Sequence, residues 1–72
     1  MRNKVIELLT KVLKVGISDE SSSETMPEWD SLAHMRIVVM IEDSFDIEVE
    51  DEMLPKLNSL VSIIKYLESK IG

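Results

Sequence analysis

The sequence predicts an all-α fold, a four-helix bundle in which one helix is short, and three observations support it. Apolar residues recur with helical spacing near both ends of the chain. Polar residues suited to helix caps precede two of the helical segments. The one alternating stretch, residues 46–50, would have no partner strand. With 72 residues the chain has room for one domain, which we expect to span residues 1–72.

The first helix is predicted from apolar residues near the start of the chain. They follow the spacing i, i+3, i+4, i+7 and i+8 and are Val5, Leu8, Leu9, Val12 and Leu13. Gly16 is expected to end this helix, because glycine adopts the left-handed conformation of a C-terminal cap without steric strain. Residues 17–28 show no period and predict a long loop, in which Ile17 and Met26 are expected to pack against the core.

A second helix is predicted from about Ser31 to about Ser44. Asp30 is its expected N-cap, since the carboxylate can accept from backbone N–H groups of the first turn. The helix has more apolar residues than one buried face needs. One stripe contains Ile37, Val38, Ile41 and Phe45, and outside it lie Leu32, Met35, Val39 and Met40. Such a helix is either buried on several sides or offers an apolar surface to a partner.

The rest of the chain predicts an extended loop and two helices. Residues 46–50 are interpreted as a loop whose Ile47 or Val49 packs into the core. Residues 51–56 predict a short helix that ends near Pro55, with Met53 and Leu54 facing inward. Asn58 is the expected cap of the last helix. That helix repeats apolar residues at helical spacing, namely Leu60, Ile63, Ile64, Leu67 and Ile71.

The composition excludes several classes of protein. Fourteen acidic and eight basic residues give a net charge of −6, which argues against binding nucleic acid or an anionic membrane and favours basic partners. Between Glu28 and Glu52, nine residues are acidic and only Arg36 is basic. Cysteine is absent, which excludes a disulfide scaffold, a thiolate metal site and a cysteine nucleophile. Neither a membrane span nor a signal peptide is predicted, so we expect a cytoplasmic protein.

Ser31 stands where a hydroxyl group could carry a phosphodiester. It follows Asp30 at the predicted start of the second helix, where free backbone N–H groups and the positive end of the helix dipole favour an anion. A serine at such a place more often only helps to cap the helix. The triplet Asp30-Ser31-Leu32 alone does not distinguish the two roles.

Nearly the whole chain resembles the acyl carrier protein family. The similarity lies in Asp30-Ser31-Leu32, in residues 37–47, in residues 49–52 and in residues 58–67. In that family the serine of the Asp-Ser-Leu motif receives 4'-phosphopantetheine from coenzyme A, and the thiol of this arm carries acyl groups as thioesters. The resemblance implies that Ser31 is the attachment point, that a phosphopantetheinyl transferase modifies it and that the protein is not an enzyme. The arm would supply the thiol that the cysteine-free chain lacks.

The resemblance also implies a partner surface on the second helix, which would meet basic patches on the transferase and on the enzymes that load and transfer acyl groups. The matching residues are Asp30, Leu32, Met35, Val39, Glu42 and Asp43. We expect Glu42 and Asp43 to be exposed and the protein to be a monomer.

Three positions depart from the pattern of fatty-acid carriers. Ala33 and Arg36 stand at positions that are often acidic, and Trp29 stands where glycine is common. The Trp-Asp-Ser-Leu variant looks more like stand-alone carriers that serve a dedicated pathway, such as polyketide, polysaccharide-modifying or other acyl or aminoacyl transfer. Trp29 itself is interpreted either as a core residue that closes the loop or as a neighbour of the arm.

Three other functions fit parts of the sequence. An unmodified acidic interaction module would dock on a basic partner through the same helix, and it is the main competitor. A hydrolase built on Ser31, His34 and Asp30 is disfavoured, because so small a core has little room for an oxyanion hole and a substrate pocket. The carboxylates within residues 48–52 are groups that could bind a divalent cation, but no calcium-loop spacing is present and no metal site is predicted.

Overall fold

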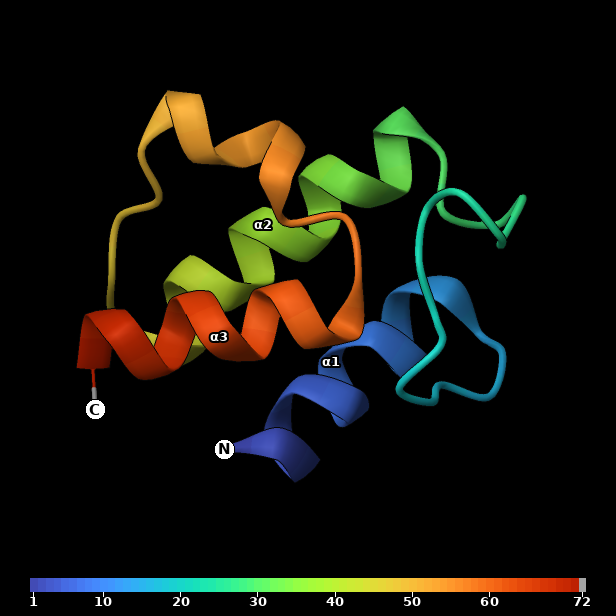
Figure 1. The fold of residues 1–72 in the computed structure, drawn as a ribbon, viewed down its shortest axis with the longest axis horizontal. Coiled ribbons are helices and arrows are strands. Elements are labelled where there is room, and N and C mark those ends of the chain that lie inside the picture. The colour runs from blue at the N-terminus through green and yellow to red at the C-terminus, as the bar shows by residue number, and fades with distance from the viewer. Residues whose placement is uncertain (72) are drawn as a thin grey trace.

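The computed structural model describes residues 1–71, and regular structure in this range is helical apart from one isolated β-bridge between Ser22 and Ser59. The elements follow in the order α1 (Arg2–Leu13), α2 (Ser31–Phe45), the 3-10 helix η1 (Asp51–Lys56) and α3 (Leu60–Ile71). Figure 1 shows the three α-helices packed together, with η1 in the connection from α2 to α3. The predicted fold, four helices of which one is short, is confirmed.

The core is built from apolar side chains of all three α-helices and of the connecting segments. Each such side chain stabilises the fold by roughly 1.5–3 kcal/mol when it is fully removed from water. The buried members are Val5, Leu8, Leu9, Leu13, Trp29, Ile37, Val38, Ile41, Val49, Leu57, Leu60, Ile63 and Leu67. Ile17 and Met26 pack against this core from the long loop, as predicted. None of the helices within residues 1–71 combines the length and the apolarity that a membrane crossing requires.

The first helix ends before Gly16. Lys14 adopts the left-handed conformation, with φ of 60° and ψ of 32°, and its N–H donates to the carbonyl of Thr10 at 2.8 Å. The prediction that Gly16 caps α1 is wrong, because this bond closes the helix before the chain reaches the glycine, whose φ is not positive. Val12, expected on the buried face, is only half-buried.

The second helix starts where the sequence predicts. The Asp30 carboxylate accepts a hydrogen bond from the Ala33 N–H at 2.8 Å, which confirms the N-cap. The buried residues of α2 are Ile37, Val38 and Ile41. Three of the surplus apolar residues are exposed, with fractions of 65% for Leu32, 47% for Met35 and 51% for Val39. The helix is therefore not buried on every side, and three of its four surplus apolar residues lie at the surface, whereas Met40 is half-buried against the core.

The segment after α2 is a loop, as predicted, and not a strand. Val49 is buried in the core and Ile47 is half-buried against it. The short helix η1 forms over the predicted residues and ends at Lys56, next to Pro55, as expected. Met53 and Leu54 are half-buried and pack against the core.

The last helix is capped by Ser59 and not by Asn58. The Ser62 N–H donates to Ser59 Oγ at 3.1 Å, and the Ser59 N–H donates to Ser62 Oγ at 3.1 Å. Asn58 instead accepts, through its backbone carbonyl, from the Ser23 N–H of the long loop at 2.8 Å. This contact with the loop moves the start of α3 one residue later than predicted. Ile71, assigned to the apolar stripe, is 48% exposed.

Candidate functional site

Ser31 is the first residue of α2, and its side chain is exposed. The Asp30 carboxylate accepts from the Ala33 N–H of the first turn, and the N–H groups of Ser31 and Leu32 have no carbonyl partner inside the helix. These donors and the positive end of the helix dipole therefore lie next to the Ser31 hydroxyl. The position fits a phosphate ester, which needs an accessible oxygen and a locally positive environment.

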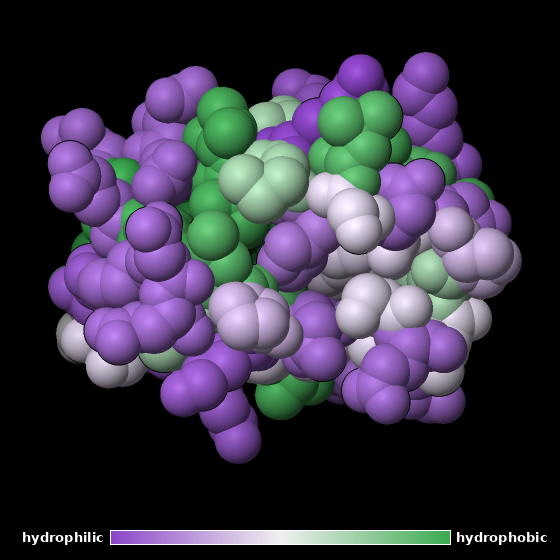
Figure 2. Space-filling view, turned by 90° about the horizontal axis from the view of Figure 1, so that it is seen from above, coloured by the Kyte–Doolittle hydropathy of each residue, from purple (hydrophilic) through white to green (hydrophobic). Residues whose placement is uncertain are grey.

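An open pocket of about 390 Å³ lies beside Ser31, between the long loop, α2 and η1. Its lining residues are Ser23, Trp29, Asp30, Ser31, His34, Met35, Pro55 and Asn58. Figure 2 views the face that carries η1 and the start of α2, and on it hydrophobic residues reach the surface in separate patches bordered by hydrophilic ones. Ser31 thus opens onto a hollow of mixed polar and apolar character.

A chain of hydrogen bonds, which we call the histidine bridge, joins Trp29, His34 and Leu54. The Trp29 Nε1–H donates to His34 Nδ1 at 3.0 Å, and His34 Nε2 lies 2.6 Å from the carbonyl oxygen of Leu54. An indole N–H can only donate, so Nδ1 is the acceptor and Nε2 carries the hydrogen that it donates to Leu54. The bridge therefore fixes both the tautomer and the orientation of His34.

The histidine bridge removes His34 from any catalytic triad with Ser31. Both ring nitrogens of His34 are engaged, with Trp29 and Leu54. The Asp30 carboxylate accepts from the Ala33 N–H and not from the imidazole. A hydrolase mechanism requires a histidine nitrogen within hydrogen-bond reach of the serine hydroxyl, and the geometry does not provide it.

Trp29 meets both interpretations that the sequence left open. It is 3% exposed and belongs to the core, so it closes the long loop onto the helices. It also lines the pocket beside Ser31, and its ring stacks near that of His34 with a centroid distance of 6.3 Å. The sequence did not indicate the contact with Leu54, because every residue has a backbone carbonyl and the residue pattern does not show which of them accepts a hydrogen bond.

The residues expected to meet partners divide into two groups. Leu32, Met35 and Val39 are exposed on α2, as are Asp30 and Asp43. Glu42, in contrast, is half-buried, and its carboxylate accepts from the Val49 N–H at 2.9 Å. The expectation that Glu42 is exposed is wrong, because its side chain turns to the loop that follows α2 and holds it in place.

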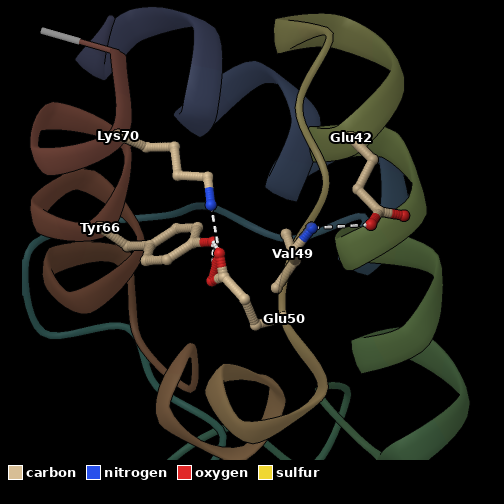
Figure 3. Close-up of polar contacts among 5 residues, drawn as sticks. All are labelled: Glu42, Val49, Glu50, Tyr66 and Lys70. Atoms are coloured by element: carbon tan, nitrogen blue, oxygen red, sulfur yellow. Dashed lines mark hydrogen bonds and ion pairs between the residues drawn. The ribbon is translucent and has the colours of Figure 1, made fainter.

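Glu50 forms a polar cluster with α3 that the sequence did not predict. Figure 3 shows this residue between α2 and α3, one position after the Val49 that Glu42 holds. The Tyr66 hydroxyl donates to Glu50 Oε2 at 2.9 Å, and Lys70 Nζ pairs with the same carboxylate. These hydrogen bonds lower the pKa of Glu50, with Lys70 contributing most, and Glu50 in turn raises the pKa of Lys70. Burial and the bond to Glu50 raise the pKa of Tyr66. Glu50 is therefore a structural anchor.

Comparison with known proteins identifies the family to which this chain is similar. The family described as "Phosphopantetheine attachment site" matches residues 3–67. An acyl carrier protein of Buchnera aphidicola is 27% identical, over 97% of this chain and 92% of that protein. Acyl carrier proteins of an Exiguobacterium species and of Akkermansia muciniphila are 43% and 42% identical, over 58% and 60% of this chain and 53% and 54% of their own lengths. No solved structure matches the chain.

The family match has direct consequences for the chemistry. It covers nearly all of the residues that the structure describes, including every helix up to Leu67. The group that this family attaches is 4'-phosphopantetheine. The chain therefore belongs to the acyl carrier protein family, whose members carry their cargo on phosphopantetheine and do not catalyse reactions themselves.

Proposed function

We propose that Ser31 is the residue that carries 4'-phosphopantetheine and that the protein holds acyl or aminoacyl groups as thioesters for the enzymes of a dedicated biosynthetic or acyl-transfer system. The observation that carries this proposal is the exposed Ser31 hydroxyl at the capped start of α2, within the Asp-Ser-Leu triplet and the range of the family match. We further propose that residues 1–72 form one acyl carrier domain. A monomeric state and a cytoplasmic location stay predictions of the sequence.

The residues around Ser31 have distinct tasks in this proposal. In the modification, Ser31 Oγ loses its proton and forms the new phosphodiester bond, while the pyrophosphate bond of coenzyme A breaks and its adenosine 3',5'-bisphosphate part leaves. Asp30 fixes the first turn of α2 through the Ala33 N–H, so the backbone that carries the hydroxyl is held in one place for the transferase. The helix dipole stabilises the negative charge of the ester. The thiol at the end of the arm supplies the thioester chemistry.

The partner surface of the proposal is the exposed part of α2. Leu32, Met35 and Val39 provide apolar area, and Asp30 and Asp43 provide negative charge near it. A surface of this kind favours enzymes with a basic rim around an apolar contact. Glu42 contributes its charge while its carboxylate stays bound to the Val49 N–H.

Three residues support a dedicated carrier over a general fatty-acid carrier. Arg36 is exposed on α2 within the otherwise acidic segment from Glu28 to Glu52, so it changes the charge pattern that partners meet. Ala33 adds no charge in the first turn of the helix. Trp29 adds a large aromatic residue to the pocket beside Ser31. Arg36 and Ala33 thus change the charges that a partner enzyme meets, and Trp29 changes the wall of the pocket.

Intact mass spectrometry tests the proposal. The purified protein is incubated with coenzyme A and a broad-specificity phosphopantetheinyl transferase, in parallel with Ser31→Ala and with Ser44→Ala, an exposed serine of the same helix. We expect one phosphopantetheine increment on the wild type and on Ser44→Ala, and none on Ser31→Ala. No increment on the wild type with several transferases would favour the unmodified interaction module. Hydrolysis of a test ester that is lost with Ser31→Ala would favour an enzyme.

A further inference from the structure

One wall of the pocket beside Ser31 is made by two segments that are fastened together through their backbones. The Ser23 N–H of the long loop donates to the carbonyl of Asn58 at 2.8 Å, and the Leu60 N–H donates to the carbonyl of Ser21 at 3.1 Å. Ser23 and Asn58 both line the pocket. Backbone hydrogen bonds therefore fix this wall, and its shape does not depend on a ligand.

A second wall of the pocket is fixed by the histidine bridge. Trp29 and His34 line the pocket, and the bridge ties both of them to the carbonyl of Leu54 in η1. With both walls in place, the pocket exists before anything binds to it. A ligand that bound there would have little of the surrounding chain to order, which favours binding.

The side chains of Asn58 and Ser23 have no structural task in this arrangement. Asn58 was the expected cap of α3, but Ser59 accepts the hydrogen bond from the first turn instead. Within residues 1–71, Asn58 and Ser23 form hydrogen bonds only through their backbones. Both residues are half-buried at the pocket. An asparagine amide and a serine hydroxyl can each donate and accept, so this wall offers the pocket polar groups that no other residue uses.

The rest of the pocket is different in character, because most of its exposed lining is apolar. Trp29, Met35 and Pro55 contribute apolar walls to a hollow of about 390 Å³. Small-molecule sites have roughly this size, with apolar walls and a few well-placed polar groups. A purely hydrocarbon chain would separate Asn58 and Ser23 from water without giving them hydrogen bonds, which is unfavourable. The pocket fits a ligand in which amide groups alternate with short hydrocarbon segments.

The arm that this family attaches has such a structure. In 4'-phosphopantetheine a hydrocarbon segment with two methyl groups lies next to the phosphate, and a hydroxyl and two amides joined by short methylene segments follow. Ser31 itself lines the pocket, so an arm attached there begins at the edge of the hollow. An acyl group at the far end of the arm would reach the pocket only if the arm turned back.

We propose that this pocket holds the pantetheine arm between reactions, with hydrocarbon segments of the arm against Trp29 and Met35 and one of its amides bonded to Asn58 and Ser23. The inference rests on the proposed attachment at Ser31 and deepens it by assigning the residues that hold the arm. The juxtaposition that carries it is a pair of unused polar side chains on a fixed wall, in a mainly apolar pocket that the attachment residue lines.

Nuclear magnetic resonance of the unmodified and modified protein tests this proposal. The chain has two asparagines and no glutamine, so its side-chain carboxamide signals come only from Asn58 in the pocket and from Asn3, an exposed residue of α1. Trp29 gives the single indole signal. After loading from coenzyme A, we expect the signals of the Asn58 carboxamide and the Trp29 N–H to shift and that of Asn3 to stay. We also expect nuclear Overhauser effects from the methyl groups of the arm to Trp29 and Met35.

Variants test whether the two polar side chains hold the arm. Asn58→Ala and Asn58→Leu keep the backbone carbonyl that accepts from Ser23, and the second also keeps the approximate shape of the side chain. Removing one hydrogen bond of ordinary strength should lower the equilibrium constant for docking roughly fivefold, so the Overhauser effects to Trp29 should weaken. Ser23→Ala should act in the same direction, and Asn3→Ala should behave as the wild type. The melting temperature of each unmodified variant shows whether its fold is intact.

The possible results separate the docking of the arm from its attachment. No mass increment on the wild type would overturn the proposed function and this inference together. A loaded wild type whose signals change only at Ser31 and its neighbours in α2 would overturn the inference and leave the attachment intact. Overhauser effects that stay unchanged in Asn58→Leu and Ser23→Ala would overturn the role of these side chains. Pocket contacts that arise only from an octanoyl group, after loading from octanoyl coenzyme A, would overturn the inference by assigning the pocket to the cargo.

Discussion

At the scale of single residues, the most informative position is His34. Its two nitrogens connect an indole N–H to a backbone carbonyl, so both partners are satisfied in a half-buried place. Each of these groups would cost about 1–3 kcal/mol if it were left without a partner. The spacing of Trp29 and His34 is visible in the sequence, but the third member is the main-chain oxygen of Leu54, which any residue could provide. The bridge could therefore not be predicted from the sequence, although the position of Ser31 at the start of α2 and the N-cap Asp30 were predicted.

The lowered pKa of Glu50 leads to a prediction about stability in acid. Its pKa is lower in the folded protein than the ordinary 4.5, mainly because of Lys70 and then Tyr66. A lowered carboxyl pKa means that the stabilisation is complete above about pH 4.5 and is lost as the pH falls through the folded value. The raised pKa of Lys70 sets the other limit, since its contribution is lost only as the pH rises above 10.5. We expect Glu50→Gln to be less stable than the wild type at neutral pH and to lose less stability on acidification.

Urea unfolding followed from neutral pH to below 4.5 measures this difference. Glu52→Gln is the matched control, because Glu52 is an exposed carboxylate in the neighbouring η1. Its pH profile should follow that of the wild type. Parallel profiles for Glu50→Gln and the wild type would show that the cluster with Lys70 and Tyr66 adds no stability in solution.

At the scale of the elements, helical spacing predicted which segments fold and capping decided where they end. The surplus of apolar residues on α2 left two alternatives open, a helix buried on several sides or one with an apolar surface, and the structure gives the second, with Leu32 65% exposed. The ends of α1 and α3 were less predictable, because more than one neighbouring residue is suited to cap each of them. Lys14 adopts the left-handed conformation that ends α1, two residues before Gly16, which was expected to adopt it. Asn58 is held by the long loop, which leaves the cap to Ser59.

Glu42 and Asp43 are neighbours on α2 that should respond differently to substitution. Glu42 holds the Val49 N–H, so Glu42→Lys should lower the free energy of unfolding by about 1 kcal/mol or more. Asp43 is exposed, so Asp43→Lys should leave stability nearly unchanged and slow the modification of Ser31 through weaker attraction to a basic transferase. Urea unfolding and the initial rate of modification separate the two effects. Equal loss of stability in both variants would contradict the assignment of Glu42 to the loop.

At the scale of the whole molecule, charge is distributed unevenly along the chain. Residues 1–27 hold four acidic and four basic residues, whereas nine of the fourteen acidic residues lie between Glu28 and Glu52. That segment contains Ser31, all of α2 and the start of η1. The acidic residues are therefore concentrated on α2 and on the segment that follows it, in the part of the chain that also carries the proposed attachment residue, where they can attract and orient a basic enzyme.

This distribution predicts that modification of Ser31 depends on salt and on the position of each charge. Raising the salt concentration from about 0.02 M to about 0.5 M should lower the rate constant of modification, measured at low protein concentration, by roughly tenfold. At the higher concentration the Debye length is shorter than the distance over which the acidic protein and the basic transferase attract each other. Arg36→Ala and Lys65→Ala each make the net charge one unit more negative, but only Arg36 lies on α2. We expect Arg36→Ala to raise the rate at low salt by about twofold and Lys65→Ala to change it less, because local potential controls encounter. Equal increases would assign the effect to net charge alone, and a decrease with Arg36→Ala would mean that Arg36 pairs with an acidic residue of the transferase.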